Sequence, residues 1–466
     1  MTTNPCRVVI RGVLILAVVV SLVVLSLEWK RRHDLYWYDV RQDYSYAFES
    51  EPPVEVATHL SKNGFDFPGI DGNWDTALLP IKVETTWSSY WFEPSIEIRT
   101  DETSWTQTFE RGARGLRYLI LHQDAIQPGE KVYMEGKHIR WPDQERQLLL
   151  FSNPGVTRAK LLVLAPHPDD AEIAAFGLYS NTDSYVATIS AGNYVDGLYA
   201  HLSDDTSVQD TLRGRLRTWD SLVVPTWGGV DPTRIVNLGY WNGSLTYLYR
   251  RRFAGAVPAA IARQNPNSFR SGAVAELLGG RVATATWRSL VEDLRVLMEA
   301  VDPELIVAPH PAIDAAEDHR FTTLALLEAL EENGDRVTPL LLYTNHHFLS
   351  EYYPFGPMHS AVTLPPVFDG KGVMTGVYSQ WLSEHDRMDK LFALEAMHDL
   401  RAAPRELTGG PTERFITLAA AAVDGLVRNP LGTYSYFRRS VRVNELFFVV
   451  QPADRERLRK ASESSQ

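Results

Sequence analysis

The chain contains very little of what a disulfide framework or a thiolate metal site requires. Its 466 residues include one cysteine, Cys6, which excludes an intrachain disulfide and a zinc site built on several thiolates. Basic residues are also outnumbered, since 46 Lys and Arg face 58 Asp and Glu and give a formal net charge of −12. Nucleic-acid binding depends on neutralising phosphates with basic side chains, so we expect no nucleic-acid partner.

The N-terminus carries a long apolar run. Residues 12–27, GVLILAVVVSLVVLSL, have no charge, and together with residues 8–10 they approach the roughly 20 residues that cross a bilayer. We predict a single-pass membrane anchor within residues 1–33, which contacts the bilayer through residues 8–27. A cleaved signal peptide is the alternative, but no small-residue cleavage pattern follows Ser26.

The remaining sequence divides into four segments by its patterning. Residues 34–52 are polar and aromatic and predict a linker. Residues 53–152 consist of short alternating runs separated by turn signals, which predicts a small antiparallel β-sandwich. Residues 158–450 alternate between strand-like and helix-like stretches, which predicts an α/β fold with a Rossmann-like parallel sheet and helices on both faces. Residues 451–466 form a polar tail.

The α/β segment predicts individual elements as well. The strands are expected over residues 161–166, 185–190, 235–240, 305–309 and 340–345. The helices are expected after Asp170 and over residues 207–223, 284–301, 317–333, 384–402 and 413–427.

One stretch, LLVLAPHPDDAEIAAFG at residues 161–177, places an imidazole and two carboxylates where a strand opens into a helix. The carboxyl ends of strands are where open α/β sheets bind ligands. His167 and Asp170 are three residues apart, so both can face one point at the start of a helix. An imidazole and a carboxylate suit zinc or a similar divalent ion. The alternative is a helix N-cap with an Asp pair on the helix dipole.

A catalytic zinc site usually has three protein ligands and keeps one position open. We expect the third ligand after the strand at residues 305–309, where the segment HPAIDAAEDH ends in Asp318 and His319. Asp169 then lies beside the metal without binding it. Such a carboxylate can deprotonate an attacking water whose pKa the ion has lowered.

These residues resemble a known family. The run HPDDAEI at residues 167–173 is similar to the signature of the PIG-L/LmbE-like de-N-acetylases, metal-dependent enzymes that remove acetyl groups from N-acetylglucosamine units. LGYWNG at residues 238–243 resembles the Leu-Gly-x-x-Asp-Gly segment of the family. DAAEDH at residues 314–319 resembles its Asp-x-His-x-Asp-His motif. The resemblance covers roughly residues 158–400.

The resemblance implies the roles of the central residues. It makes His167, Asp170 and His319 the metal ligands and Asp169 the general base, with zinc as the ion and iron as the alternative. The first histidine of the second family motif falls on Ala316. The general acid is therefore open, and we name two replacements: the catalytic candidate His310, and His398.

The resemblance also implies substrate contacts. Asn193 stands where relatives often have a glutamate, which implies an altered sugar contact. Arg213, Arg215 and Arg217 lie where relatives carry a substrate arginine, and one of them could hold a phosphate or an acidic sugar with two hydrogen bonds. We predict that Asn193, Arg213, Arg215 and Asp318 bind the substrate.

Together, the anchor and the resemblance predict a hydrolase that removes an N-acetyl group from an amino sugar of a membrane-borne glycan or glycolipid, such as lipopolysaccharide core. One alternative is an amidase or esterase that acts on a small sugar conjugate. Another is a non-catalytic glycan-binding protein whose deacetylase domain has decayed. Family habit and the missing disulfides favour the cytoplasmic face of the inner membrane.

Overall fold

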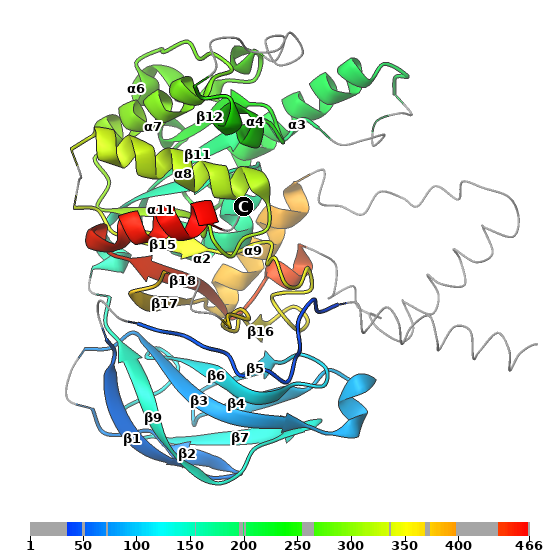
Figure 1. The fold of residues 1–466 in the computed structure, drawn as a ribbon, viewed down its shortest axis with the longest axis vertical. Coiled ribbons are helices and arrows are strands. Elements are labelled where there is room, and N and C mark those ends of the chain that lie inside the picture. The colour runs from blue at the N-terminus through cyan, green and yellow to red at the C-terminus, as the bar shows by residue number, and fades with distance from the viewer. Residues whose placement is uncertain are drawn as a thin grey trace, which may run out of the picture.

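Two β-rich units lie against each other in the computed structural model, the first in the lower part of the view and the second above it (Figure 1). The structure describes residues 35–48, 52–70, 73–153, 155–194, 199, 202–253, 265–334, 337–368, 373–397 and 437–464. The predicted anchor at residues 8–27 and the predicted helix at residues 413–427 lie outside the described residues. Within the described part of the chain, no helix combines the length and apolarity that a membrane span needs.

The first unit consists of two five-stranded sheets packed face to face. One sheet has the order β1-β9-β3-β6, with β8 paired to β3, and the other has the order β16-β5-β4-β7-β2. Its strands are β1 (Val54–Leu60), β2 (Gly64–Asp66), β3 (Thr76–Thr85), β4 (Ser95–Arg99), β5 (Ser104–Thr108), β6 (Arg114–His122), β7 (Lys131–Lys137), β8 (Ile139–Arg140), β9 (Gln144–Phe151) and β16 (Ser360–Ala361). Ile96 and Ile98 alternate along β4 and are fully buried between the sheets, as the period of two in a strand requires.

The second unit is built on an eight-stranded mixed sheet with the order β13-β12-β11-β10-β14-β15-β18-β17. These strands are β10 (Lys160–Ala165), β11 (Asp183–Ser190), β12 (Ile235–Tyr240), β13 (Ser271–Gly272), β14 (Leu305–Pro309), β15 (Leu340–Tyr343), β17 (Gly376–Trp381) and β18 (Asn444–Val450). The five strands from β12 to β15 are parallel, whereas β13, β18 and β17 pair antiparallel with their neighbours.

The prediction of an all-parallel sheet is therefore wrong at both edges. The residues of β18, NELFFVV, are all buried, and a continuous apolar run does not show in which direction a strand runs. β18 lies between β15 and β17 and runs antiparallel to both.

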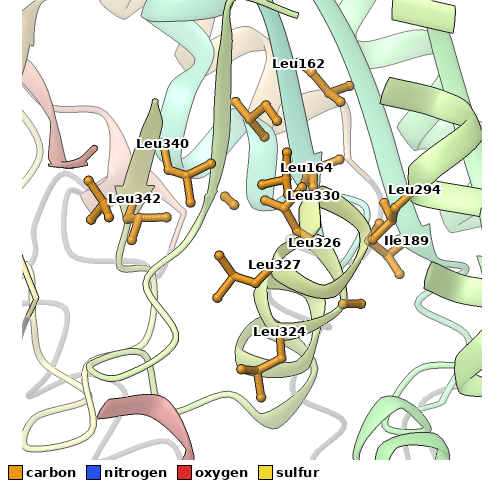
Figure 2. Packing of buried hydrophobic residues seen from close by; sticks show 14 of the residues in the cluster. Leu162, Leu164, Ile189, Leu294, Leu324, Leu326, Leu327, Leu330, Leu340 and Leu342 are labelled. Atoms are coloured by element: carbon orange, nitrogen blue, oxygen red, sulfur yellow. The ribbon is translucent and has the colours of Figure 1, made fainter. Parts of the chain in front are cut away.

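Helices cover both faces of this sheet. They are α2 (Asp170–Ser180), α3 (Thr206–Trp227), α4 (Leu245–Arg250), α6 (Val274–Leu278), α7 (Trp287–Val301), α8 (Glu317–Glu332), α9 (Glu384–Ala396) and α11 (Arg455–Ser464). Leu162 and Leu164 of β10 pack in one core with residues of α7 and α8, such as Leu294 and Leu326 (Figure 2). The alternate residues of β10 face the opposite core, which includes α2. Each fully buried leucine stabilises the folded state by about 1.5–3 kcal/mol, so packing on both faces stabilises the centre of the sheet.

The segment that precedes the first unit packs into the junction between the two units. The hydroxyl of Tyr44 donates to Oε1 of Glu110 over 2.6 Å, and Arg117 Nη2 lies 2.9 Å from the same oxygen. Tyr46 stacks on Phe448 of β18 with ring centres 6.3 Å apart. Residues 35–48, which lie within the predicted linker, therefore contact both units through side chains such as Tyr44 and Tyr46.

The predicted polar tail at residues 451–466 contains helix α11. Leu458 is fully buried and Ser462 and Arg455 are buried, whereas Glu456, Arg457 and Lys460 are exposed. Arg459 Nη1 lies 3.9 Å from Glu331 of α8. One apolar stripe is enough to fix this largely polar helix against α8.

Candidate metal centre

Two neighbouring parallel strands bring the predicted ligands together. β10 pairs with β14, with Val163 opposite Val307, so both strands end at the same edge of the sheet. His167 follows β10, and Asp170 is the first residue of α2. His319 lies in the first turn of α8, the helix that follows β14. Residues 152 positions apart in sequence therefore meet because their strands are adjacent.

Three ligand atoms form a small triangle at this edge. Asp170 Oδ2 lies 3.0 Å from His319 Nε2 and 3.1 Å from His167 Nδ1. The two imidazole nitrogens are 3.3 Å apart. A tetrahedral ion with bonds of about 2.0–2.1 Å holds its ligand atoms about 3.3 Å from one another. The residues present therefore fit a divalent ion with three protein ligands and one further position, and among the described residues they form the group that could hold such an ion.

Each histidine is held by a carboxylate on its other ring nitrogen. Asp314 Oδ2 lies 3.2 Å from Nδ1 of His319, and Asp318 Oδ2 lies 3.3 Å from Nε2 of His167. These contacts leave Nε2 of His319 and Nδ1 of His167 directed at Asp170. A carboxylate behind a histidine ligand fixes its ring and its tautomer and raises its basicity. The two rings are therefore set to bind a metal ion through Nε2 of His319 and Nδ1 of His167.

A buried amide completes the support of the centre. The side chain of Asn345 donates from Nδ2 to Oδ1 of Asp170 over 2.8 Å, and its backbone N–H donates to Oδ2 of Asp314 over 2.9 Å. Asn345 follows β15, the third parallel strand to end at this edge. One residue therefore connects a metal ligand with the carboxylate that supports another.

The electrostatics of the centre favour a cation. Burial alone would lower the pKa of His167, but hydrogen bonds with Asp170 and Asp318 raise it to about 9. Burial would raise the pKa of Asp170, yet the charge of the neighbouring His319 holds it well below its usual range. In the metal-free protein Asp170 is therefore ionised and His167 holds a proton, which an incoming ion would displace.

Asp169 is held by an arginine from α3. Its Oδ1 lies 2.9 Å from Nη2 of Arg217, which also donates to the carbonyl of Pro168 over 3.1 Å. Gly192 makes room for this arginine. Its φ is +62°, and a Cβ atom there would lie 2.9 Å from Nε of Arg217. Any residue other than glycine would therefore clash with the arginine side chain.

The predicted substrate arginines differ in position. Arg213 is buried, and its Nη1 donates to the carbonyl of Tyr194 over 2.7 Å. Arg215 is exposed on the outer side of α3. Arg213 and Arg217 are four residues apart and share one helix face, from which Arg215 is turned away. Arg217 is the arginine that the structure brings to Asp169.

Both oxygens of Asp318 are occupied by the protein. Oδ2 accepts a hydrogen bond from the N–H of Gly243 over 2.6 Å, and Oδ1 accepts one from the N–H of Leu245 over 3.2 Å. With His167 on Oδ2 as well, this carboxylate joins the start of α4 to the metal centre. The structure thus shows Asp318 in contact with the protein on both oxygens, and its predicted contact with substrate stays a prediction.

Asn193 is fully buried behind the loop that follows β11. Its Oδ1 accepts a hydrogen bond from the N–H of Asn242 over 3.0 Å, and among the described residues its Nδ2 has no partner. The side chain of Asn242 donates in turn to the carbonyl of Tyr194. Asn193 therefore helps fix the loop that carries Gly192.

Residues 162–330 match the sequence model of the family described as PIG-L: GlcNAc-PI de-N-acetylase. This segment is therefore similar to a PIG-L domain. It runs from β10 to α8 and contains all three candidate ligands. No curated protein sequence matches the chain.

Solved structures resemble the chain only weakly. A 4-carboxy-2-hydroxymuconate hydratase from Pseudomonas putida is 13% identical, with 62% of this chain and 95% of that chain covered and a TM-score of 0.30. A pentameric capsid protein from metagenomic phage sequences is 12% identical, with 23% and 69% covered and a TM-score of 0.13. A family two carbohydrate esterase from Cellvibrio japonicus is 10% identical, with 63% and 88% covered and a TM-score of 0.13. At these TM-scores the likenesses support no conclusion about function.

Of the two histidines named as replacements at Ala316, the structure describes His310. His310 is fully buried and packs edge-to-face on Phe448, with ring centres 5.7 Å apart, and burial lowers its pKa to about 4. His398 lies outside the described residues.

A third histidine, His346, does lie beside the centre. Its ring centre is 5.2 Å from that of His319. Its backbone carbonyl accepts a hydrogen bond from the N–H of Ala315 over 2.6 Å, next to Ala316. The signal for it was present in the sequence, since the predicted strand at residues 340–345 leads directly into His346 at the same edge of the sheet.

Proposed function

We propose that this protein is a metal-dependent hydrolase that removes the N-acetyl group from an N-acetylglucosamine-type sugar. The observation that carries the proposal is the triangle of His167, Asp170 and His319 inside a segment that matches a de-N-acetylase family. A divalent ion held there would polarise the acyl carbonyl and lower the pKa of a water molecule. We propose zinc, with iron as the alternative, because two imidazoles and one carboxylate suit both.

The general base in this proposal is Asp169. It lies in the same turn as the two ligands from β10, and its side chain is 13% exposed, so water can reach it. It accepts the proton of the water that attacks the acyl carbon. The ion pair with Arg217 keeps the carboxylate in one orientation, so Arg217 acts as a positioning residue.

We assign His346 the place of the imidazole that the PIG-L domain lacks at Ala316. Burial and the charge of His319 lower the pKa of His346, so at neutral pH it is an uncharged hydrogen-bond donor. In that form it can donate to the acyl oxygen as negative charge develops there, and the leaving nitrogen regains the proton held by Asp169.

The proposed substrate is a membrane-borne glycan or glycolipid, such as lipopolysaccharide core, reached from the cytoplasmic face. The support for this part is the apolar run at residues 8–27, which would hold the site next to such a substrate. Ala316 and Asn193 favour the second candidate function, a glycan-binding protein without turnover. His346 beside His319 argues for the enzyme.

The experiment compares acetate release by the full-length protein from N-acetylglucosamine glycolipids and from soluble conjugates. The wild type should release acetate, and a chelator should stop it. Asp169→Asn should keep its metal and lose at least about 100-fold in rate. Asp101→Asn, at an exposed aspartate of the first unit, is the control.

Full activity of Asp169→Asn would rule out its role. Tight glycan binding with bound metal and no acetate release would favour the non-catalytic alternative. Equal rates on soluble conjugates would favour the small-substrate hydrolase.

A further inference from the structure

A cavity of about 50 Å³ lies next to the candidate metal centre on the side of β18. It lies between the start of α2, the end of β15, β18 and the loop at residues 353–362. Asn345, the residue that donates to Asp170, is part of its wall. The volume is several times the roughly 10–15 Å³ that one water molecule needs, so the cavity has room for a small polyatomic group.

Two guanidinium groups line this cavity without a carboxylate partner among the described residues. Arg442 is 1% exposed and, among the described residues, donates to backbone carbonyls alone, from Nη1 to Phe355 over 2.6 Å and from Nη2 to Pro354 over 2.7 Å. Arg439 donates from Nη2 to the carbonyls of Tyr352 and Pro354. Burial, together with the charge of Arg439, lowers the pKa of Arg442 to about 9, which leaves it protonated at neutral pH.

The acidic groups nearby are already engaged. Glu445 pairs with Lys390 over 2.7 Å and accepts two backbone N–H groups at the C-terminal half of α2, so these two charges cancel. Glu395 pairs with Arg438 over 2.8 Å. Glu93 lies 3.7 Å from Arg111 and accepts a hydrogen bond from the hydroxyl of Tyr352. The cavity therefore keeps an excess of positive charge.

Three buried polar atoms of the lining residues have no hydrogen-bond partner among the described residues. They are Nε of Arg439, Nε of Arg442 and Oγ1 of Thr344. Buried donors in native proteins are almost always paired, and several unpaired ones around one cavity indicate a missing ligand. Guanidinium and hydroxyl donors together match the oxygens of an anion.

We infer that this cavity is a binding site for a small oxyanion, a phosphate or carboxylate group. The group occupies the space between Arg439, Arg442 and Thr344 and accepts their free hydrogen bonds. It comes either from the substrate, as an anionic substituent of the sugar, or from solution, as a free ion beside the metal centre. The site itself does not depend on the proposed hydrolysis, because binding can be measured without turnover.

The test is a calorimetric titration of the full-length protein with inorganic phosphate, as purified and again after chelator treatment, so that binding to a metal is separated from binding in the cavity. The wild type should bind phosphate saturably in both states. Arg439→Gln should weaken binding about tenfold or more, and Thr344→Val, which keeps the shape of the side chain, should weaken it by a smaller factor.

Arg438→Gln is the matched control, because Arg438 lies on the same turn but pairs with Glu395. It should bind phosphate as the wild type does. Arg442 is left unchanged, since it also holds the carbonyls of residues 354–356 and its loss could unfold the loop. The inference is overturned if the chelator-treated wild type shows no saturable binding up to about 10 mM, or if Arg438→Gln weakens binding as much as Arg439→Gln.

A second arm distinguishes the two sources of the oxyanion. If the group belongs to the substrate, Arg439→Gln should raise KM for a phosphorylated N-acetylglucosamine and leave KM for the unphosphorylated sugar unchanged. If the oxyanion is a free ion from solution, Arg439→Gln should change KM for both substrates by the same factor. Absence of turnover would count against the proposed function, whereas the phosphate titration would still decide the site.

Discussion

Asp169 is joined to Arg217 by an ion pair of 2.9 Å that connects the loop after β10 with helix α3. The same arginine donates to the carbonyl of Pro168, the residue before Asp169. The orientation of the proposed general base is therefore set by a helix that contributes none of the three candidate metal ligands.

Replacing Arg217 with Gln should lower kcat up to about 100-fold while KM changes little, because a misplaced base affects the reaction more than binding. Arg217→Lys should recover part of the loss. Arg215→Gln, on the exposed side of the same helix, should behave as the wild type. Steady-state kinetics with metal analysis check this. A rise in KM alone would show that Arg217 contacts substrate instead.

Asp314→Asn should weaken metal binding by about 10–100-fold, because it removes the negative charge behind His319. Competition with a chromogenic chelator measures the change. Glu317→Gln is the control. This carboxylate lies in the same turn of α8 as His319 but accepts a hydrogen bond from Thr246. Equal affinity in Asp314→Asn and the wild type would exclude the supporting role.

Glu172 should make the metal-free protein less stable as pH rises. Burial raises the pKa of this carboxyl from 4.5 to about 7, although Tyr179 donates to it over 3.1 Å. The folded state then holds the proton more tightly than the unfolded chain, so its contribution is complete below about pH 4.5 and is lost through pH 7.

The loss corresponds to about 3 kcal/mol of unfolding free energy. Urea unfolding of chelator-treated protein between pH 4.5 and 8 measures it. Glu172→Gln should remove this part of the pH dependence. A wild-type stability that is flat over this range, or the same slope in both proteins, would contradict the assignment.

His346→Ala should lower kcat by about 100-fold or more if this imidazole donates to the reacting group. The double variant Ala316→His with His346→Ala should regain part of the activity, since residue 346 is hydrogen-bonded to Ala315, the neighbour of residue 316. His385→Ala, at an exposed histidine of α9, is the control. Unchanged kcat in His346→Ala would exclude it from the reaction.

The sequence contained enough to predict the centre of the site. His167 and Asp170 share a turn, and their spacing at the end of a strand is visible without any structure. His319 depended on the second motif, because the pairing of β10 with β14 is a long-range contact that local periodicity does not contain. The predicted parallel strands β10, β11, β12, β14 and β15 are present.

Other features could not be predicted because they depend on where side chains meet in three dimensions. Arg217 pairs with Asp169, whereas Arg215 does not face it, because α3 buries the face that carries Arg217 and exposes the face that carries Arg215. The engagement of Asp318 follows from the backbone N–H groups at the start of α4. The place of β18 between β15 and β17 depends on a pairing of strands that are distant in sequence.

Residues 35–48, which pack between the two units, also constrain the loop that carries His346. The hydroxyl of Ser350 donates to the carbonyl of Leu35 over 2.8 Å, and the N–H of Trp37 donates to the carbonyl of Leu349 over 2.9 Å. The loop that carries His346 is thus fastened to the start of the described chain. Residues 35–37 therefore take part in placing the loop that carries His346, so deleting them should loosen the position of this proposed catalytic histidine.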